Sequence, residues 1–511
     1  MQKLPIGIQS FRSLREGEFL YIDKTQAIYQ LVNAGKYYFL SRPRRFGKSL
    51  TINTLAELFR GSKELFHGLW IEDKWDWNQK NPVIHIGFSS LGYKTIGLKE
   101  AITQRLFEEA QRYHLTLTKT GIDNLLRELI QKLHAQQGKV VILIDEYDKP
   151  IIDYLEEIEH AKQNRDILKT FYSVLKDADE QLRFVFLTGV SKFSKTSIFS
   201  ELNNLDDLSM HPSYVNLLGY TPEELLHYFS DYIEHLAPKF KGKAAFLSKI
   251  KEWYNGYSWD GIHHVYNPFS ILNFFGKGVF RNYWFESGTP TFLVKLLNRN
   301  QTYKLDHIQV GQAAFSSFEL DRIDPIALLF QTGYITIQSV DEYDIYTLSY
   351  PNKEVRDSLL QYLLAEYTHE YPSTLPTTAL MMKKALEQEN LNSFIESLNS
   401  LFASIPYQLF INQKEAYYHS ITYLALSLMG IYIQVEPSVS RGRPDAVVFT
   451  SSLTYLIEFK LDASAKMAIE QIKSKGYGDA VKRSEKKLAL LGINFNSSEK
   501  KIDDWIVEYL H

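Results

Sequence analysis

The fold of this chain is decided by residues 42–49, which read Arg-Pro-Arg-Arg-Phe-Gly-Lys-Ser. They follow a short apolar stretch, Tyr37–Leu40, and lead into a helical pattern that runs from Ser49 to Arg60 and stops at Gly61. A loop between a strand and a helix can direct its backbone N–H groups at a phosphate beside the helix N-terminus. The stretch therefore predicts a phosphate-binding loop in an α/β sheet domain.

Lys48 and Ser49 hold the two positions that carry chemistry in such a loop. The lysine neutralises the charge of β- and γ-phosphates, and the hydroxyl ligates magnesium, so we expect ATP and Mg²⁺ here. Arg42 stands where the usual pattern has its first glycine, and the loop alone would fit an ordinary capped helix about as well. Arg44 and Arg45 either add phosphate contacts or point at a nucleic acid. The predicted nucleotide-binding residues are Arg45, Phe46, Gly47, Lys48, Ser49, Leu50 and Asp145, with Ser49 and Asp145 as magnesium ligands.

An acidic pair later in the chain supports this interpretation. The apolar run Val140–Ile144 predicts a strand buried on both faces, and Asp145 and Glu146 follow it directly. Parallel sheets bind ligands at the carboxyl ends of their strands. We expect Asp145 to hold magnesium and Glu146 to be the catalytic residue that polarises the attacking water. Thr188 and Ser191, after the next predicted strand, are either γ-phosphate sensors or plain turn residues.

The order of patterns along the chain indicates several domains. The first 210 residues alternate strand and helix signals, which is typical of a parallel α/β sheet. Helical patterns dominate from Thr221 to about residue 300. Between Pro325 and Glu366 the order is helix, hairpin, helix, which is compatible with a winged-helix module. The stretch Tyr371–Pro376 is the best candidate for a linker.

A second set of chemically suitable residues lies near the C-terminus. Asp445 begins an apolar strand, and Glu458 and Lys460 lie on one face of the next strand because strand side chains alternate. Magnesium-dependent hydrolysis of a phosphodiester needs carboxylates on the metal and a cation near the attacking water. A solvated hairpin with unrelated charges is the alternative, since Glu-x-Lys alone is a common pattern.

The N-terminal motifs resemble the predicted AAA-ATPase-like proteins of bacteria. The resemblance covers roughly residues 1–290, and the arginine in place of the first glycine belongs to that family's pattern. It implies ATP binding without implying a known substrate. The segments that carry it are Leu4–Ile8, Tyr21–Thr25, Arg42–Ser49, Ile144–Asp148, Tyr254–Tyr257 and Tyr266–Phe269.

The C-terminal residues, roughly 400–511, are similar to the PD-(D/E)XK nuclease superfamily. The resemblance implies that Asp445 and Glu458 bind metal and that Lys460 positions or activates water. It also implies that Glu415 is the helical acid of the metal site and that Gln471 is a polar residue after the core motif. The catalytic residues predicted for the whole chain are Glu146, Asp445, Glu458, Lys460 and Gln471, and the predicted metal ligands are Ser49, Asp145, Glu415, Asp445 and Glu458.

We therefore expect a multidomain α/β protein with three parts. Residues 1–220 form an AAA-like P-loop ATPase domain with a parallel sheet. Residues 221–375 form a helical lid and the winged-helix-compatible region. Residues 376–511 form an α/β nuclease-like domain.

Net charge and cysteine content limit the kind of nucleic-acid surface and the cellular compartment that we expect. The formal net charge is −3, so any surface that binds nucleic acid must be local. One candidate is the basic cluster Lys473, Lys475, Lys482, Arg483, Lys486 and Lys487, although such a run is often a solvated face. The chain has no cysteine, and its start lacks the apolar stretch of a signal peptide. We expect a cytoplasmic protein with no membrane span.

These observations predict an ATP-hydrolysing protein coupled to a metal-dependent nuclease acting on DNA or RNA. Defence against foreign nucleic acid is a role inferred only from this pairing of activities. Two alternatives stay open. One is an ATP-dependent switch or sensor that binds nucleic acid without cutting it. The other is a nuclease whose first half binds nucleotide without turnover. Homo-oligomerisation also stays open, because no arginine can be assigned as an intersubunit finger.

Overall fold

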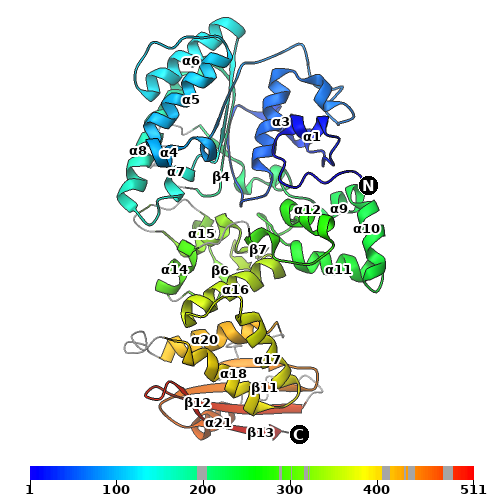
Figure 1. The fold of residues 1–511 in the computed structure, drawn as a ribbon, viewed down its shortest axis with the longest axis vertical. Helices are drawn as coiled ribbons and strands as arrows, with labels where there is room; N and C mark the ends of the chain where they lie inside the picture. The colour runs from blue at the N-terminus through cyan, green and yellow to red at the C-terminus, as the bar shows by residue number, and fades with distance from the viewer. Residues whose placement is uncertain are drawn as a thin grey trace. The chain divides into compact units, whose positions relative to one another are not determined.

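The apolar runs of the N-terminal half form one parallel sheet in the computed structural model (Figure 1). Its strands are β1 Tyr37–Ser41, β2 Val83–Gly87, β3 Val140–Asp145, β4 Leu182–Gly189 and β5 Asp206–Asp207. Their order is β2-β3-β4-β1-β5, and every pairing is parallel. The predicted α/β class is confirmed. Because these strands are all parallel, the loop after β1 and the acids at the end of β3 lie at the same edge of the sheet.

The structure describes residues 1–192, 204–286, 291–300, 302–315, 320, 323–405, 415–430, 433–434, 444–475 and 487–510. The chain divides into two units, one of residues 1–292 and 305–356 and the other of residues 293–304 and 357–511. The linker candidate at 371–376 lies inside the second unit. The three-domain limits stay a prediction. Among the described helices, none combines the length and apolar character that a membrane span requires.

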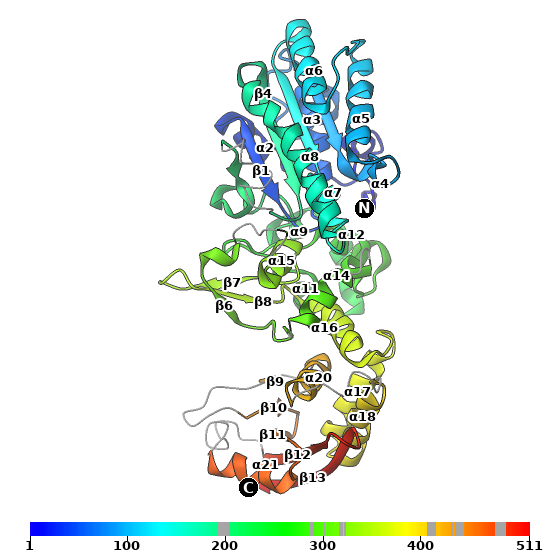
Figure 2. The ribbon, with the colours of Figure 1, turned by 90° about the vertical axis from the view of Figure 1, so that its left-hand side faces the viewer.

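Helices cover both faces of the parallel sheet. Helix α3 lies on one face, and α5, α6 and α8 lie on the other (Figures 1 and 2). The predicted helix from 49 to 60 is α3, and its stop at Gly61 is confirmed. The helices and 3-10 turns of this region are α1 Phe11–Glu16, α2 Thr25–Ala34, α3 Lys48–Arg60, η1 Lys63–Phe66, η2 Phe88–Ser90, α4 Tyr93–Ile96, α5 Leu98–Arg112, α6 Ile122–Gln137, α7 Lys149–Ile152, α8 Ile158–Asp177 and η3 Asp179–Gln181.

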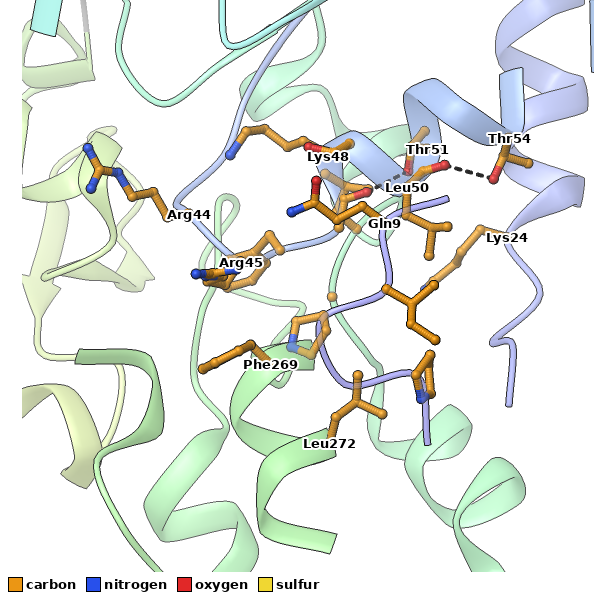
Figure 3. A pocket seen from close by; sticks show the side chains of 18 of the residues that line it. Gln9, Lys24, Arg44, Arg45, Lys48, Leu50, Thr51, Thr54, Phe269 and Leu272 are labelled. Carbon is orange, nitrogen blue, oxygen red and sulfur yellow. Dashed lines mark hydrogen bonds between the residues drawn. The ribbon is translucent and has the colours of Figure 1, made fainter. Parts of the chain in front are cut away.

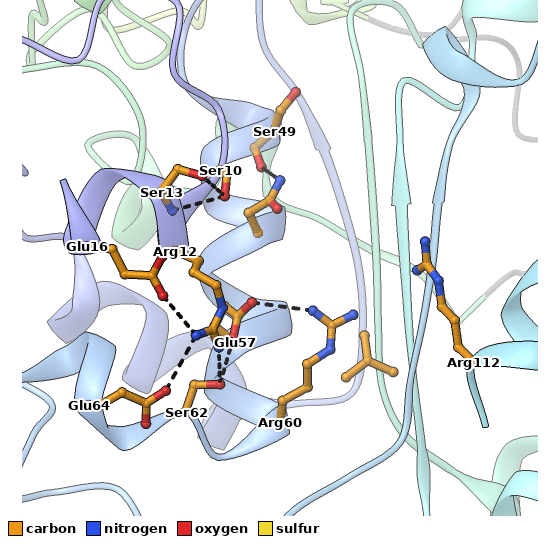
Figure 4. A network of polar contacts seen from close by, with 12 residues as sticks. Ser10, Arg12, Ser13, Glu16, Ser49, Glu57, Arg60, Ser62, Glu64 and Arg112 are labelled. Atoms are coloured by element: carbon orange, nitrogen blue, oxygen red, sulfur yellow. Dashed lines mark hydrogen bonds and ion pairs between the residues drawn. The ribbon is translucent and has the colours of Figure 1, made fainter. Parts of the chain in front are cut away.

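A polar network holds the C-terminal end of α3 (Figure 4). Arg12 on α1 donates to Glu57 on α3 at 2.9 Å and to Ser62 at 3.2 Å, and Ser62 donates to Glu57 at 2.6 Å. Arg12 also pairs with Glu16 and Glu64. These contacts tie α1 and the turn after α3 to the helix that begins at the phosphate loop.

A helical region follows the parallel sheet. Its core joins Leu20 and Ile22, from the segment before α2, to buried residues of the helices such as Leu225, Phe229 and Phe274. The N-terminal segment is therefore packed against helices more than two hundred residues later in the sequence. The elements are η4 Leu208–Met210, η5 Pro212–Tyr214, α9 Pro222–Tyr228, α10 Ser230–Leu236, η6 Ala237–Lys239, α11 Lys243–Tyr254, α12 Pro268–Lys277 and α13 Tyr283–Glu286.

The predicted helix and hairpin after residue 325 are confirmed. Helix α15 (Pro325–Thr332) ends at Gly333, and β7 (Thr336–Val340) pairs antiparallel with β8 (Tyr346–Ser349). A third strand, β6 (Ile308–Val310), adds to β8 and was missed because three residues carry too little periodic signal. The winged-helix interpretation stays a prediction. The neighbouring elements are η7 Gln312–Phe315, α14 Thr291–Arg299 and α16 Lys353–Thr368.

The C-terminal unit contains a mixed five-stranded sheet in the order β13-β12-β11-β10-β9. Only the β11–β12 pairing is parallel, and α21 provides the crossover between these strands. Helix α21 lies on one face, and α17, α18 and α20 lie on the other (Figures 1 and 2). The bounds are β9 Ile433–Gln434, β10 Ala446–Phe449, β11 Leu453–Leu461, β12 Lys487–Asn496, β13 Lys501–Leu510, α17 Leu375–Glu387, α18 Leu391–Ala403, α20 Glu415–Leu428 and α21 Ala465–Ser474.

Close approach of α21 to this sheet depends on Gly492. A Cβ built on Gly492 would lie 2.4 Å from the carbonyl oxygen of Ala465, the first residue of α21. Gly492 on β12 is the register partner of Glu458 on β11. The missing side chain therefore lets α21 pack tightly beside Glu458, which brings Gln471 of that helix to the predicted nuclease site.

Candidate functional sites

The phosphate loop connects β1 to α3. Gly47 is the N-cap of α3 and has a φ of 95°, in the left-handed region that favours glycine. A Cβ at Gly47 would meet no atom within 4 Å, so the residue borders open space. Arg45 is also left-handed, with a φ of 67°. These two turns fold the loop around the N-terminus of α3, where the helix dipole and free N–H groups favour an anion.

The buried side chain of Arg42 anchors the phosphate loop. This side chain is 1% exposed, and Nη1 donates to the carbonyl oxygens of Ser41 at 2.9 Å and Ser209 at 2.7 Å. The guanidinium stacks on the Trp259 ring at 3.8 Å from the ring centroid. Burial lowers the pKa of Arg42 to about 9, against the opposing effects of Asp207 and Asp260. The residue at the first-glycine position thus serves as a structural anchor.

Lys48 lies at the base of the loop. Its Nζ donates to the carbonyl oxygens of Arg42 at 2.8 Å and Pro43 at 2.9 Å. Burial lowers the pKa of Lys48, while the nearby charges of Asp145 and Glu146 act to raise it. The ammonium is therefore held between loop carbonyls and the acids that follow β3, where a polyphosphate would meet it.

The two predicted acids differ in their surroundings. Asp145 ends β3, is 7% exposed, and accepts a 2.6 Å hydrogen bond from Thr188 Oγ1 on β4. Glu146 lines the cavity beside Lys48 and has a φ of 54°, a strained conformation for this residue type. Burial, then the charge of Asp145, raises the pKa of Glu146. A carboxylate with a raised pKa is a better proton acceptor, which suits the role predicted for Glu146.

Sequence reasoning missed Asp148. This carboxyl is 1% exposed and its Oδ2 accepts from Ser191 Oγ at 2.8 Å and from the backbone N–H groups of Val190 and Ser191 at 3.0 and 2.7 Å. Burial raises the pKa of Asp148. Thr188 and Ser191, considered as γ-phosphate sensors, instead direct their hydroxyls at Asp145 and Asp148. Asp148 was visible in the sequence as a second aspartate shortly after Asp145. From the sequence alone, a buried aspartate of the site could not be distinguished from an aspartate that caps a helix.

A cavity of about 420 Å³ opens at the loop (Figure 3), within the range of ligand pockets. Its polar and charged lining includes Lys48, Ser49, Glu146, Asp148 and Lys149. Its apolar lining includes Pro5, Ile8, Leu20, Ile22, Leu217, Leu218, Phe269 and Leu272. Of the predicted nucleotide-binding residues, those that line the cavity are Arg45, Phe46, Gly47, Lys48, Ser49 and Leu50. Charged and apolar side chains in one cavity suit the phosphates and the base of a nucleotide.

The second predicted site assembles on the β10–β11 hairpin. Asp445 immediately precedes β10, and its Oδ2 accepts a 2.7 Å hydrogen bond from the backbone N–H of Phe459 on β11. Glu458 and Lys460 flank Phe459 on the same strand. The Lys460 ammonium lies 3.3 Å from Glu458 Oε1, and Gln471 Nε2 of α21 donates to the same oxygen. Lys460 and Gln471 thus converge on Glu458, and Asp445 is held beside the same strand.

The pKa of Glu458 is shifted far from its ordinary value. Glu458 is 2% exposed, and burial, then the charge of Asp445, raises its pKa to about 7. Among the residues that the structure describes, its Oε2 is buried and meets no hydrogen-bond partner. Two neighbouring carboxylates with an unsatisfied oxygen are the donor set that a divalent cation such as Mg²⁺ prefers. The residues that are described therefore fit a metal.

The side chains of some predicted residues lie outside the described part of the chain. Glu415 is the first residue of α20, but its side chain is not among those described. Lys482, Arg483 and Lys486 of the basic cluster lie outside the described residues. Within the described part of the chain, no three or more His, Asp or Glu side chains form a metal-binding group. His419, one turn along α20, places Nδ1 3.7 Å from Asp445 Oδ1.

Comparison with known proteins agrees with both sites. The model of the family described as predicted AAA-ATPase matches residues 5–199, and that of the PD-(D/E)XK nuclease superfamily matches residues 413–505. A protein of Azotobacter chroococcum mcd 1, named "Uncharacterized protein in vnfD 5'region", is 41% identical over 523 residues, covering 100% of this chain and 99% of its own length. The chain belongs to the predicted AAA-ATPase family and carries a PD-(D/E)XK nuclease-superfamily domain. No solved structure matches it.

In this predicted AAA-ATPase, two hydrogen bonds link the phosphate loop to α16. Trp284 Nε1 on α13 donates to the carbonyl oxygen of Arg44 in the loop at 3.0 Å. The backbone N–H of Trp284 donates to Glu354 Oε1 at 2.7 Å, and Ser270 Oγ donates to Glu354 Oε2 at 2.7 Å. Glu354 is fully buried in the first turn of α16, and from residue 357 onward this helix belongs to the second unit. This connection could not be predicted from the sequence, because it joins segments that are far apart in the chain.

Proposed function

We propose that the protein hydrolyses Mg-ATP at the phosphate loop and uses nucleotide state to control a metal-dependent nuclease acting on DNA or RNA. The observation that carries the nuclease half is the convergence of Lys460 and Gln471 on Glu458, beside Asp445. The observation that carries the ATPase half is the placement of Lys48 and Glu146 on one cavity at the N-terminus of α3.

In the ATPase half, each residue has a separate task. Lys48 neutralises phosphate charge, and the N–H groups at the start of α3 bind phosphate oxygens. Asp145, oriented by Thr188, and Ser49 would hold a magnesium ion, which would supply positive charge beside the phosphates. Glu146 accepts a proton from the attacking water, and burial prepares it for this by raising its pKa.

In the nuclease half, Asp445 and Glu458 would hold a divalent metal, which would supply Lewis-acid stabilisation of charge on the scissile phosphate. Gln471 orients the Glu458 carboxylate through its hydrogen bond to Oε1. Lys460 stands beside the same carboxylate, where its ammonium positions the attacking water and neutralises charge.

An ATP-dependent switch that binds nucleic acid without cutting is the second candidate. It is favoured by one observation: the carboxylate oxygen Oδ2 of Asp445 is already used by the Phe459 N–H, and the described residues supply no third metal ligand. The two candidates differ in whether a phosphodiester bond is broken.

The deciding experiment incubates the full chain with single- and double-stranded DNA and RNA, with and without ATP and Mg²⁺. Metal-dependent cleavage that disappears in Asp445→Asn supports the nuclease. Binding without cleavage by any divalent metal supports the switch. Defence against foreign nucleic acid in the cytoplasm is the role that we assign to the pair, and it requires that cells carrying Asp445→Asn lose protection against phage or plasmid entry.

A further inference from the structure

A short segment from the middle of the chain belongs to the nuclease unit. Residues 293–304, which we call the crossing segment, group with residues 357–511, although the residues before and after them belong to the first unit. The segment lies more than a hundred residues before the start of the PD-(D/E)XK match at residue 413. The nuclease unit is therefore larger than the domain that the comparison recognises.

The crossing segment is firmly packed. Leu293, Val294 and Leu297 of α14 are buried, with at most 4% of each side chain exposed. At its end the Tyr303 ring packs edge-on against Tyr423 of α20, with ring centroids 5.4 Å apart. Such buried apolar and aromatic contacts fix the position of the residues that follow them.

The end of the segment borders the nuclease carboxylates. Tyr303 and Lys304 line a small pocket together with Asp445, Phe459 and His419. The Lys304 ammonium lies 5.7 Å from the centroid of the Tyr303 ring. Lys460 and Gln471 approach Glu458, whereas Lys304 and His419 lie on the side of Asp445. Asp445 thus shares a pocket with Lys304, whereas Glu458 is approached by Lys460 of its own strand.

We propose that Lys304 binds a phosphate of the nucleic-acid substrate next to the scissile bond, and that Tyr303 is the positioning residue that holds it there. This inference rests on the proposed nuclease function. A substrate whose scissile phosphate reaches a metal on Asp445 brings its neighbouring phosphates close to the residues around Asp445, Lys304 among them. Lysine is a compact cation that binds phosphate without base specificity.

The charge of the molecule makes such a local contact necessary. With a formal net charge of −3, the protein as a whole does not attract nucleic acid, so affinity must come from individual cations at the site. Lys304 and Asp445 line the same small pocket, so the charge of Lys304 lies near the proposed metal site.

The test compares Lys304→Ala and Lys304→Arg with Lys466→Ala in the full chain. Lys466 is a matched control because it is a lysine of the same unit, on α21, with 78% of its side chain exposed and only a 4.0 Å pairing with Glu470. Binding of labelled DNA and RNA oligonucleotides is measured from low to moderate salt with Ca²⁺ in place of Mg²⁺, and cleavage is measured with Mg²⁺.

Lys304→Ala should weaken binding by roughly tenfold for every sequence tested, and raise KM more than it lowers kcat. The slope of log K against log salt should fall by about 0.7–0.9, the value for one lost phosphate contact. Lys304→Arg should restore most of the binding, and Lys466→Ala should behave like the wild type. Unchanged ATPase activity and hydrogen exchange in Lys304→Ala show that the fold is intact.

Two outcomes overturn the assignment in different ways. If the wild type binds and cuts but Lys304→Ala keeps the wild-type salt slope, Lys304 makes no phosphate contact and the proposed function stands. If the wild type neither binds nor cuts any oligonucleotide, the proposed function fails and the assignment of Lys304 fails with it.

Discussion

Replacing Glu458 with Gln should stabilise the metal-free C-terminal unit at neutral and higher pH. Glu458 is buried beside Asp445, and its pKa is raised to about 7 from an ordinary value of 4.5. The folded protein therefore binds the proton more tightly than the unfolded chain does. The resulting loss of stability is absent below about pH 4.5, grows as the pH rises through the interval to 7, and is complete above it.

The size of the effect follows from the two pKa values. The difference of 2.5 (7 − 4.5) corresponds to roughly 3 kcal/mol at 1.36 kcal/mol for each pKa unit. Gln carries no charge to bury, and its amide oxygen can still accept a hydrogen bond from Gln471. It loses the attraction of Lys460, so the net gain in the free energy of unfolding should be about 1–3 kcal/mol at pH 8.

Hydrogen exchange of the amides in β11 and β12 measures this locally. The full chain is compared with Glu458→Gln from pH 5 to pH 8 in chelator, after correction for intrinsic exchange. The variant should be more protected above pH 7 and similar to the wild type near pH 5. Added Mg²⁺ should protect the wild type, by about 2.7 kcal/mol at a hundred times the Kd, and leave the variant unchanged.

Glu470→Gln is the matched control because Glu470 is an exposed carboxylate of α21 in the same unit. It should match the wild type at each pH and retain protection by Mg²⁺. Equal protection of the wild type and Glu458→Gln across the whole pH range, without metal, would refute the argument that an ionised Glu458 is costly to bury. Equal protection by Mg²⁺ in both proteins would remove Glu458 from the metal site.

Three further predictions concern the two sites and their coupling. Lys48→Ala should weaken ATP binding at least tenfold, whereas Glu146→Gln should retain binding and slow phosphate release by about 10²–10⁴-fold. Nucleotide titration and phosphate release distinguish them, and normal hydrolysis in both contradicts the phosphate-loop assignment. Asp445→Asn should abolish cleavage and leave ATPase activity intact, because the two sites lie in separate units; a loss of both activities would contradict this independence. Trp284→Phe removes the hydrogen bond to Arg44, and should reduce the ratio of cleavage rates with and without ATP, expected at about 5–150-fold in the wild type. A ratio unchanged by Trp284→Phe would make that contact purely structural.

The main elements of the two sites could be predicted from local sequence. The run from Val140 to Ile144 is apolar throughout because β3 is covered on both faces, and the residues after it are acidic. Glu458 and Lys460 were assigned to one face of a strand by alternation alone, and both contact the same site in the structure. Such predictions succeed because periodicity within one element is a short-range property.

Prediction was less successful where a residue's role depends on a distant partner. Arg42 was a departure from the usual loop pattern with no visible role, and the structure buries it against Ser209 and Trp259. Thr188 was left open between a phosphate sensor and a turn residue, and its hydroxyl is bonded to Asp145. The residue type was visible in each case, but its partner was not, since the pairing of β4 with β3 is a long-range contact.

The sequence by itself thus determined the α/β class, the phosphate loop and the two sets of acids, because each depends on a pattern of residues within one strand or one loop. Only the tertiary structure decided which side chains meet. It placed β4 between β1 and β3, brought Gln471 to Glu458 over Gly492, and put Lys304 in the nuclease unit. The physical reason is that these contacts join segments that are far apart in the chain. Such segments meet only when the apolar faces of the whole unit are buried together.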